Sequence, residues 1–351
     1  MKSHPAHDRL ARKVPEALAG LLGVSLHEMV ARSEERSGAD FVISAAGQVF
    51  VVEFKASAGA AQLASAARQL REYVGRVGRR AVPLLAVPFM GEVGRRLTEE
   101  AGIGWIDLSG NGRIVAPGIR VIIDGRPNHF RSAGRPLNIF APKSARVVRW
   151  LLTHPGEAFT QREIARATDM TEGFVSRIVS RLEHAEYLFR DDRRALRPKD
   201  PALLLDAWRE AYEFSRHTIH QGHVAARSGD ALTRSVSESL AELGIDHAAT
   251  GLAAAWAFTR FASFRIVTAY IPADPSPALV ERLGYREDPR GANLWLVVPN
   301  DSGVFHGAVE KDGIRCVHPV QAYVDLKDHP ERASEAAEQL RTDLLPWSRH
   351  A

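Results

Sequence analysis

The sequence predicts a multidomain protein of the mixed α/β class, in which an α/β region is followed by a helical region and an α+β region. The chain has 351 residues, 45% of them hydrophobic, which suffices for about two or three domains. Helix-like and strand-like stretches alternate up to about Ile123, whereas Lys143 to Trp208 is largely helical by pattern. We therefore expect domains over residues 1–123, 143–208 and 209–351, with a linker over 124–142.

Composition excludes several classes of protein. No apolar run approaches the roughly 18 residues that span a bilayer, and the N-terminus lacks the apolar core of a signal peptide. The single cysteine, Cys316, excludes a disulfide framework and a cysteine-based zinc site. We therefore expect a cytosolic protein without a membrane partner. The net charge of +4 is only a weak indication of a polyanionic partner such as nucleic acid.

The first region carries two carboxylates and a lysine in a pattern that suits metal-dependent chemistry. Asp40 precedes a short strand, and a turn leads into a second strand, VFVVEFK, on which Glu53 and Lys55 share a face. A hairpin places Asp40 near Glu53, and such carboxylates can hold Mg²⁺. Lys55 would then orient or activate water. The alternative is a plain ion pair between Glu53 and Lys55 on the sheet.

A helix that contains QLREY follows, and Gln69 lies on it. Together with Asp40, Glu53 and Lys55, this order resembles the PD-(D/E)XK nuclease superfamily. The resemblance implies a restriction-endonuclease-like α/β/α fold, with Asp40, Glu53, Lys55 and Gln69 as catalytic residues and Asp40 and Glu53 as ligands of Mg²⁺. No cofactor is expected otherwise. The family pattern also has an acidic residue on the first helix, for which Glu28, Glu34 and Glu35 are candidates. We favour a scaffold over an active nuclease.

Near its end, the first region contains a turn next to Asp107, and a stretch without periodicity follows that region. Asp107 ends a strand before a Gly/Asn turn, and we favour a role in that turn over a place at the metal site. The stretch from Asp124 to Pro142 contains Pro, Gly, Arg and Asn without periodicity, which is typical of a linker or arm.

The second region predicts a helix, a short helix and a longer amphipathic helix. Apolar residues recur at helical spacing from Val147 to Leu152, and His154 to Gly156 end that helix. Thr160 and Glu163 form a capping-box pattern before a helix over 161–168. Thr171 is the expected N-cap of the third helix, whose apolar positions are Phe174, Val175, Ile178, Val179 and Leu182.

This order is a helix-turn-helix plan, in which the last helix enters the major groove of DNA. A strand, an arginine-rich hairpin tip over Arg190 to Arg197 and a return strand then predict a wing. The segment resembles the winged helix-turn-helix superfamily of bacterial regulators over about 55 residues. The alternative is a winged helix used only for protein contact. The candidate DNA-binding residues are Thr171, Glu172, Ser176, Arg177, Ser180, Arg181, Arg190, Arg193 and Arg194.

The third region mixes helix and strand. The stretches GANLWLVVPNDSGVF and CVHPVQAYVDLKDHPER resemble the C-terminal region of the AbiEi family of bacterial antitoxins and regulators. The resemblance implies DNA-binding autorepression and, in some members, a toxin partner.

No residue cluster in the third region demands catalysis. His217, His220 and His223 have a spacing that would bring them onto one helical side. We expect a polar helix face there rather than a metal site. Asp301, His306, His318 and Asp325 are scattered in the sequence, and we expect them to be turn or surface residues.

Three functions remain open at this point. The favoured one is a sequence-specific transcriptional regulator of the repressor or antitoxin type, and its expected partner is double-stranded DNA. The second is a Mg²⁺-dependent endonuclease that the winged helix targets to DNA. The third is an antitoxin whose third region binds a toxin, and a homodimer partner is compatible with each of them.

Overall fold

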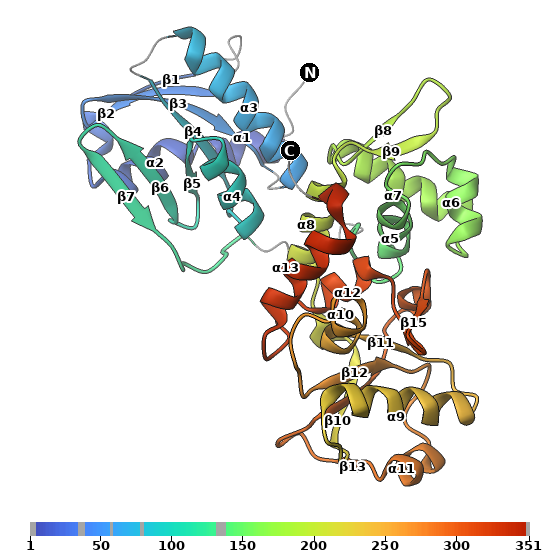
Figure 1. Ribbon diagram of the computed structural model, residues 1–351. Helices are drawn as coiled ribbons and strands as arrows, with labels where there is room; N and C mark the ends of the chain where they lie inside the picture. The colour runs from blue at the N-terminus through green and yellow to red at the C-terminus, as the bar shows by residue number, and fades with distance from the viewer. Residues whose placement is uncertain (1–4, 34–38, 57–58, 78–80, 131–137, 349–351) are drawn as a thin grey trace. The chain divides into compact units, whose positions relative to one another are not determined.

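The computed structural model of the chain describes residues 5–33, 39–56, 59–77, 81–130 and 138–348. The chain divides into two compact units, Met1–Pro136 and Leu137–Ala351. Figure 1 colours the first from blue to teal and the second from green to red. Each unit contains a seven-stranded sheet together with helices. The mixed α/β class and the multidomain organisation predicted from the sequence are therefore confirmed.

The first unit is built on a sheet in which spatial order follows chain order from β1 to β7. The first three strands form an antiparallel meander, β4 and β5 run parallel to β3, and the last two strands are antiparallel. The strands are β1 (Val30–Ser33), β2 (Phe41–Ala45), β3 (Gln48–Phe54), β4 (Ala81–Val87), β5 (Gly104–Asp107), β6 (Gly112–Ala116) and β7 (Ile119–Ile123).

Helices cover both faces of this sheet because its central strands are apolar on both sides. Leu18 of α2 packs in one core cluster with Phe50 and Phe54, whereas Leu70 of α3 packs in the other with Val51. The result is three layers, which is an α/β/α arrangement. The helices are α1 (Pro5–Ala11), α2 (Val14–Leu22), α3 (Ala60–Val77) and α4 (Glu92–Glu100), with a short 3-10 helix, η1 (Leu26–Glu28).

The second unit begins with three helices and a two-stranded sheet, and its larger sheet follows. That sheet has the order β13-β10-β14-β12-β11-β16-β15. Its strands are β10 (Thr218–His223), β11 (Ala248–Thr250), β12 (Val267–Tyr270), β13 (Arg286–Glu287), β14 (Leu294–Val298), β15 (Val309–Lys311) and β16 (Ile314–Cys316). The pairs β14–β12 and β11–β16 are parallel, and the other pairs are antiparallel.

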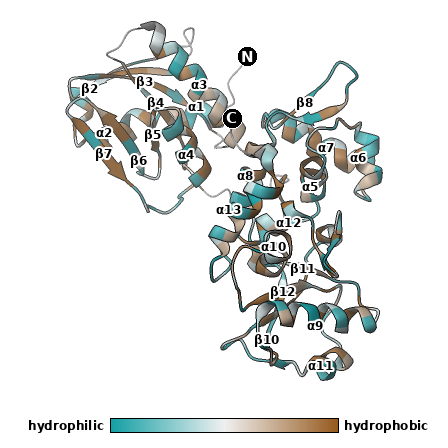
Figure 2. Cartoon of the chain, in the orientation of Figure 1, coloured by the Kyte–Doolittle hydropathy of each residue, from teal (hydrophilic) through white to brown (hydrophobic). Residues whose placement is uncertain are grey.

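Helix α10 lies in the core of this part of the unit and contacts α12, α13 and β12. It is apolar on all sides, which is typical of a buried helix. Figure 2 shows how hydrophobic residues gather on the strands and the central helices. The helices are α8 (Pro201–Ala211), α9 (Gly229–Glu242), α10 (Gly251–Thr259), α11 (Pro277–Leu283), α12 (Pro319–Asp325) and α13 (Ala333–Leu344), with the 3-10 helices η2 (Phe214–Arg216), η3 (Ser302–Phe305) and η4 (Pro346–Ser348). Among the described helices, none is long and apolar enough to cross a membrane.

The prediction that His217, His220 and His223 share one face of a helix is wrong. Thr218–His223 is the strand β10, which pairs with β13 and β14, so tertiary pairing overrides the short helical pattern. Side chains alternate along a strand, so His220 and His223 point to opposite faces. His217 precedes the strand, and its Nε2 lies 2.8 Å from the hydroxyl of Tyr212.

The turn that follows β5 uses Asp107 as its centre, as we expected. The buried carboxylate accepts hydrogen bonds from the backbone N–H groups of Met90, Ser109 and Asn111, at 3.2, 3.0 and 2.9 Å. It also accepts one from Asn111 Nδ2 at 2.9 Å. Gly110 has a φ of +95°, and a Cβ there would collide with the side chain of Arg126.

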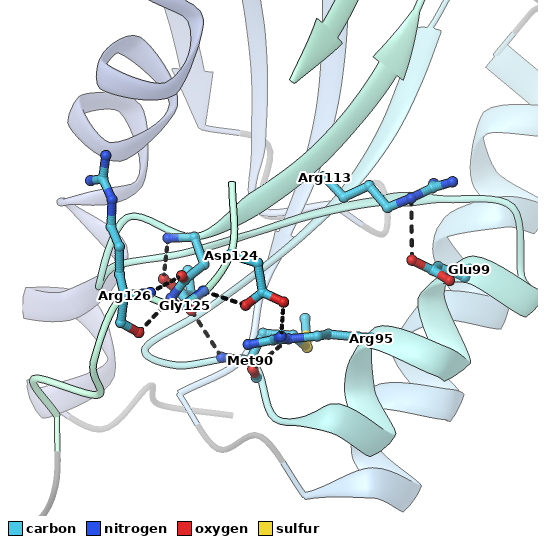
Figure 3. Close-up of polar contacts among 9 residues, drawn as sticks. Met90, Arg95, Glu99, Arg113, Asp124, Gly125 and Arg126 are labelled. Atoms are coloured by element: carbon cyan, nitrogen blue, oxygen red, sulfur yellow. Dashed lines mark hydrogen bonds and ion pairs between the residues drawn. The ribbon is translucent and has the colours of Figure 1, made fainter. Parts of the chain in front are cut away.

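The first residues of the predicted linker are bound to this turn. The backbone N–H of Arg126 donates to Asn111 Oδ1 at 2.8 Å, and its carbonyl accepts from Asn111 Nδ2 at 3.1 Å. Arg95 pairs with Asp124 at 2.5 Å, as Figure 3 shows. The segment from Asp124 to Arg126 therefore belongs structurally to the first unit.

Candidate nucleic-acid interface

Three helices at the start of the second unit share one apolar core. They are α5 (Ala145–Thr153), α6 (Gln161–Ala167) and α7 (Glu172–His184). The buried side chains recur every three or four residues, as in an amphipathic helix. They are Val147, Val148, Leu151, Leu152, Ile164, Val175, Ile178, Val179 and Leu182, each 0% exposed. This core fixes α7 with one face inward and leaves its other face to solvent.

The predicted capping box at the start of α6 is confirmed. Glu163 N donates to Thr160 Oγ1 at 3.3 Å, and Thr160 N donates to Glu163 Oε2 at 2.7 Å. These hydrogen bonds from Thr160 lower the pKa of Glu163. The reciprocal bonds satisfy two N–H groups at the helix start and fix the entry into the helix-turn-helix.

A tight turn joins α6 to α7. Met170 N donates to Ala165 O at 2.9 Å, and Asp169 adopts a left-handed φ of 52°, a conformation that Asp tolerates better than most residues. Thr171 stands at the N-cap of α7 with extended backbone, but its side chain makes no capping hydrogen bond. The predicted position of the cap is therefore right, and the predicted side-chain role is wrong.

The outward face of α7 presents hydroxyl, carboxylate and guanidinium groups. Every residue that the sequence nominated there is exposed, because the helical period alternates these positions with the buried ones. They are Thr171, Glu172, Ser176, Arg177, Ser180 and Arg181. Glu172 pairs with Arg162 of α6 at 3.2 Å, and the Arg177 guanidinium lies 5.4 Å from the ring centre of Phe174. Their contact with DNA stays a prediction.

The wing is a two-stranded hairpin of β8 (Leu188–Arg190) and β9 (Leu196–Pro198). Leu188 and Leu196 are buried and attach the hairpin to the helical core. At the tip, the Asp191 carboxylate accepts hydrogen bonds from Arg193 N at 3.0 Å and Ala195 N at 2.8 Å. Figure 1 shows the loop between the two strands extending away from the helices.

The wing arginines differ in how much they are bound within the chain. Arg190 forms an ion pair with Glu183 at 2.7 Å. Arg193 and Arg194 are exposed, and neither forms an ion pair with a carboxylate that the structure describes. Arg197 on β9 is also exposed, and sequence reasoning left it out of the candidate set. Side chains alternate along a strand, so a buried Leu196 implies that Arg197 points outward, and this alternation could have predicted its exposure.

In the first unit, the structure brings together Asp40, Glu53 and Lys55. Asp40 directly precedes β2 and lies opposite Glu53, because Phe41 pairs with Val52 in the hairpin. Asp40 Oδ2 accepts a hydrogen bond from Phe54 N at 2.8 Å, and Lys55 Nζ lies 2.7 Å from Glu53 Oε1. Burial raises the pKa of Glu53, while the hydrogen bond from Lys55 opposes that rise.

The other residues of the nuclease pattern do not complete this cluster. Gln69 is an exposed residue of α3. Val30 pairs with Ser44, so Glu28 lies near the end of β2 that is opposite to Asp40, and its carboxylate accepts from Ser25 N at 2.9 Å. Glu34 and Glu35 lie outside the described residues.

Two observations concern metal binding and residues that the sequence did not nominate. Within the described residues, no group of three or more His, Cys, Asp or Glu side chains is arranged to hold a metal ion. The ring of His7 in α1 packs edge-on against Phe54, with centroids 5.2 Å apart, and its charge lowers the pKa of Glu53. No local sequence pattern pointed to His7, because the contact depends on how α1 packs on the sheet.

Comparison with known families finds a similarity for each of the two parts of the second unit. The model of the MarR family matches residues 140–197. The model described as transcriptional regulator, AbiEi antitoxin, type IV TA system matches residues 197–345. These matches support a winged helix-turn-helix followed by an AbiEi-type region. Neither a curated protein nor a solved structure matches the chain.

Proposed function

We propose that the protein is a sequence-specific transcriptional regulator that reads double-stranded DNA with α7 and the wing. The observation that carries the proposal is the exposed face of α7, which presents Ser176, Arg177, Ser180 and Arg181 above a sealed apolar core. The matches to the MarR and AbiEi models support the same function. A helix so placed fits the width of the major groove.

The residue types divide the work between base edges and phosphates. Arg177 and Arg181 have guanidinium forks that match O6 and N7 of guanine, and the serine hydroxyls suit bases or phosphates. Arg193 and Arg194 at the wing suit backbone phosphate or the minor groove. We therefore assign specificity to α7 and a sequence-independent share of affinity to the wing.

The test is a gel-shift titration of the full chain against DNA from upstream of its own gene. We expect a retained complex that Arg177→Ala and Arg181→Ala weaken. Arg227→Ala is the matched control, because Arg227 is exposed and lies outside the winged helix. Absence of a preferred site, or equal binding by all variants, would remove the proposal.

The AbiEi-type region adds a second expectation, that of an antitoxin. We propose that residues 197–345 bind a toxin encoded next to this gene, following the description of the matched model. The test is coexpression with each neighbouring gene. Growth arrest by a neighbour that this chain relieves would support the role, and no toxic neighbour would count against it.

A nuclease is the alternative function, and the convergence of Asp40, Glu53 and Lys55 favours it. If the site is active, Asp40 and Glu53 would hold Mg²⁺, which would supply a Lewis acid and an activated water. Plasmid incubated with Mg²⁺ or Mn²⁺ tests this. Cleavage that Glu53→Gln abolishes and Glu16→Gln preserves would establish the activity, since Glu16 is an exposed residue of α2. No cleavage with either metal would remove it.

A further inference from the structure

A cavity of about 130 Å³ lies beside α5 of the winged helix. Two segments of the AbiEi-type region close it, namely the residues after η3 and the residue that caps α12. The lining residues are Arg149, Trp150, Thr153, His154, His306, Gly307 and His318. The volume exceeds what one water molecule needs and admits a small polyatomic ligand. His306 and His318 therefore do not stand apart as separate surface residues, which corrects the expectation from the sequence.

Arg149 is the unusual member of this lining. Its side chain is buried, with 4% of the residue exposed. Its guanidinium carries five N–H bonds, and Nε donates to Gln321 Oε1 at 2.9 Å. Nη1 has no hydrogen-bond partner, and within the described residues the guanidinium forms no ion pair. The guanidinium also lies 5.2 Å from the ring centre of Trp208, but a buried cation with an unused N–H donor is costly unless something else satisfies it.

The carboxylates nearest to Arg149 are already occupied. Arg146 takes Asp301 in a bidentate pair at 2.7 and 2.9 Å. We expected Asp325 to be a turn or surface residue, but it is fully buried. Gln321 lies between Asp325 and Arg149 and forms a hydrogen bond with each of them. The Asp325 carboxylate accepts from Gln321 Nε2 at 2.7 Å, and also from the hydroxyls of Tyr212, Thr250 and Tyr270. Arg149 is thus left without a direct anionic partner.

The histidines add possible donors from a different part of the chain. His318 Nδ1 accepts a hydrogen bond from Val320 N at 3.1 Å, so the proton of the neutral ring is on Nε2. Burial lowers the pKa of His318 to about 4, which keeps the ring neutral at pH 7. The His306 ring has no hydrogen-bond partner among the described residues. Donors from α5 and from the AbiEi-type region therefore surround the cavity.

We propose that this cavity binds a small tetrahedral oxyanion, either inorganic phosphate or the phosphoryl group of a small metabolite. The anion would give Arg149 its missing partner and would accept from the histidine rings. A tetrahedral anion has acceptors in several directions, which suits donors from separate segments better than the two coplanar oxygens of a carboxylate. Bound there, it would bridge the winged helix and the AbiEi-type region.

The test is isothermal titration of the full chain, first freed of phosphate by dialysis, at constant ionic strength. Inorganic phosphate, glycerol phosphate and acetate are the three titrants. We expect saturable binding of at least one of the two phosphates and none of acetate. Tighter binding of phosphate identifies the free ion as ligand, and tighter binding of the ester identifies a metabolite. No saturable binding of either phosphate, or equal binding of acetate, would overturn the proposal.

Variants locate the binding to this cavity. We expect Arg149→Gln to weaken phosphate binding at least tenfold. Among the residues that line the cavity, Arg149 is the one with a permanent positive charge, and the substitution removes that charge. Should that variant fail to fold, His306→Ala and His318→Asn keep the test decisive, because Asn can still cap α12. Each should weaken binding severalfold, whereas His223→Ala on β10 should not. Unchanged binding in both histidine variants would overturn the proposal.

Discussion

The outward face of α7 and the Asp40 cluster of the first unit both consist of charged side chains, yet they differ in how they are held. On α7, Arg177 and Arg181 project from a helix whose other face alone is bound in the core. In the first unit, Asp40 holds the N–H of Phe54, and Glu53 holds the amine of Lys55. One set is presented to solvent, and the other is engaged within its own sheet.

This difference teaches that matching residue types do not by themselves make a working site. A surface that binds DNA needs exposed cations. A metal site needs carboxylate oxygens that are free to coordinate. The α7 face meets its requirement in the structure as it stands, whereas the Asp40 cluster would have to exchange internal hydrogen bonds for metal bonds.

The largest expected effect separates the stability of the first unit from DNA binding. Asp107→Ala removes the acceptor of four buried hydrogen bonds. Because unsatisfied buried donors cost about 1–3 kcal/mol each, we expect the first unit to lose roughly 3 kcal/mol or more. Hydrogen exchange of β5 and β6 measures the loss, and Asp107→Asn should lose less. An equal loss of protection in α7 would show that the units do not respond separately.

The next effect concerns base recognition by α7. Arg177→Ala and Arg181→Ala should each cost about 1–3 kcal/mol of binding to the preferred site, or roughly 5- to 150-fold in affinity. Fluorescence anisotropy with a labelled duplex measures this change. A loss below twofold in both variants would mean that α7 does not contact bases.

A smaller effect belongs to the wing. Arg193→Ala and Arg194→Ala should each reduce the salt dependence of log affinity by about one, with little change in sequence preference. Asp192→Asn, at the same exposed tip, should act in the opposite direction because it removes a negative charge near phosphate. Titrations at several salt concentrations measure the slope. Slopes in all three variants that equal the slope of the parent protein would exclude the wing from the interface.

The smallest effect probes Glu53. Its pKa is raised by burial, so the folded state favours the protonated form, and that contribution is lost as pH rises through the folded pKa. Glu53→Gln cannot ionise, and we expect it to be more stable than the parent at pH 7 by less than about 1 kcal/mol. Below the ordinary pKa of 4.5 the two should converge. Urea unfolding at both pH values measures this, and a less stable variant at pH 7 would show that the ion pair with Lys55 outweighs burial.

Local patterns made much of this structure predictable. The capping box of Thr160 and Glu163 was readable because both partners lie within one helical turn. The exposure of Ser176 and Arg177 was readable because the helical period separates them from Val175 and Ile178. The match of the AbiEi model agrees with the resemblance noted in the third region.

Long-range pairing made the rest unreadable. The histidines of β10 follow a helical spacing, but the strand exists because β14 pairs with it. The position of Glu28 depends on the register between β1 and β2. The neighbourhood of Arg149 depends on Gln321, which lies 172 residues away in the chain. None of these contacts has a signal in the local sequence.

The central claim is that α7 reads bases, and a specificity profile tests it most directly. The parent protein and Arg177→Ala would each be titrated against every single-base variant of the selected site. We predict that the variant loses discrimination at one or two adjacent base pairs and keeps it elsewhere. Uniform weakening across all sequences, with an unchanged profile, would contradict the account.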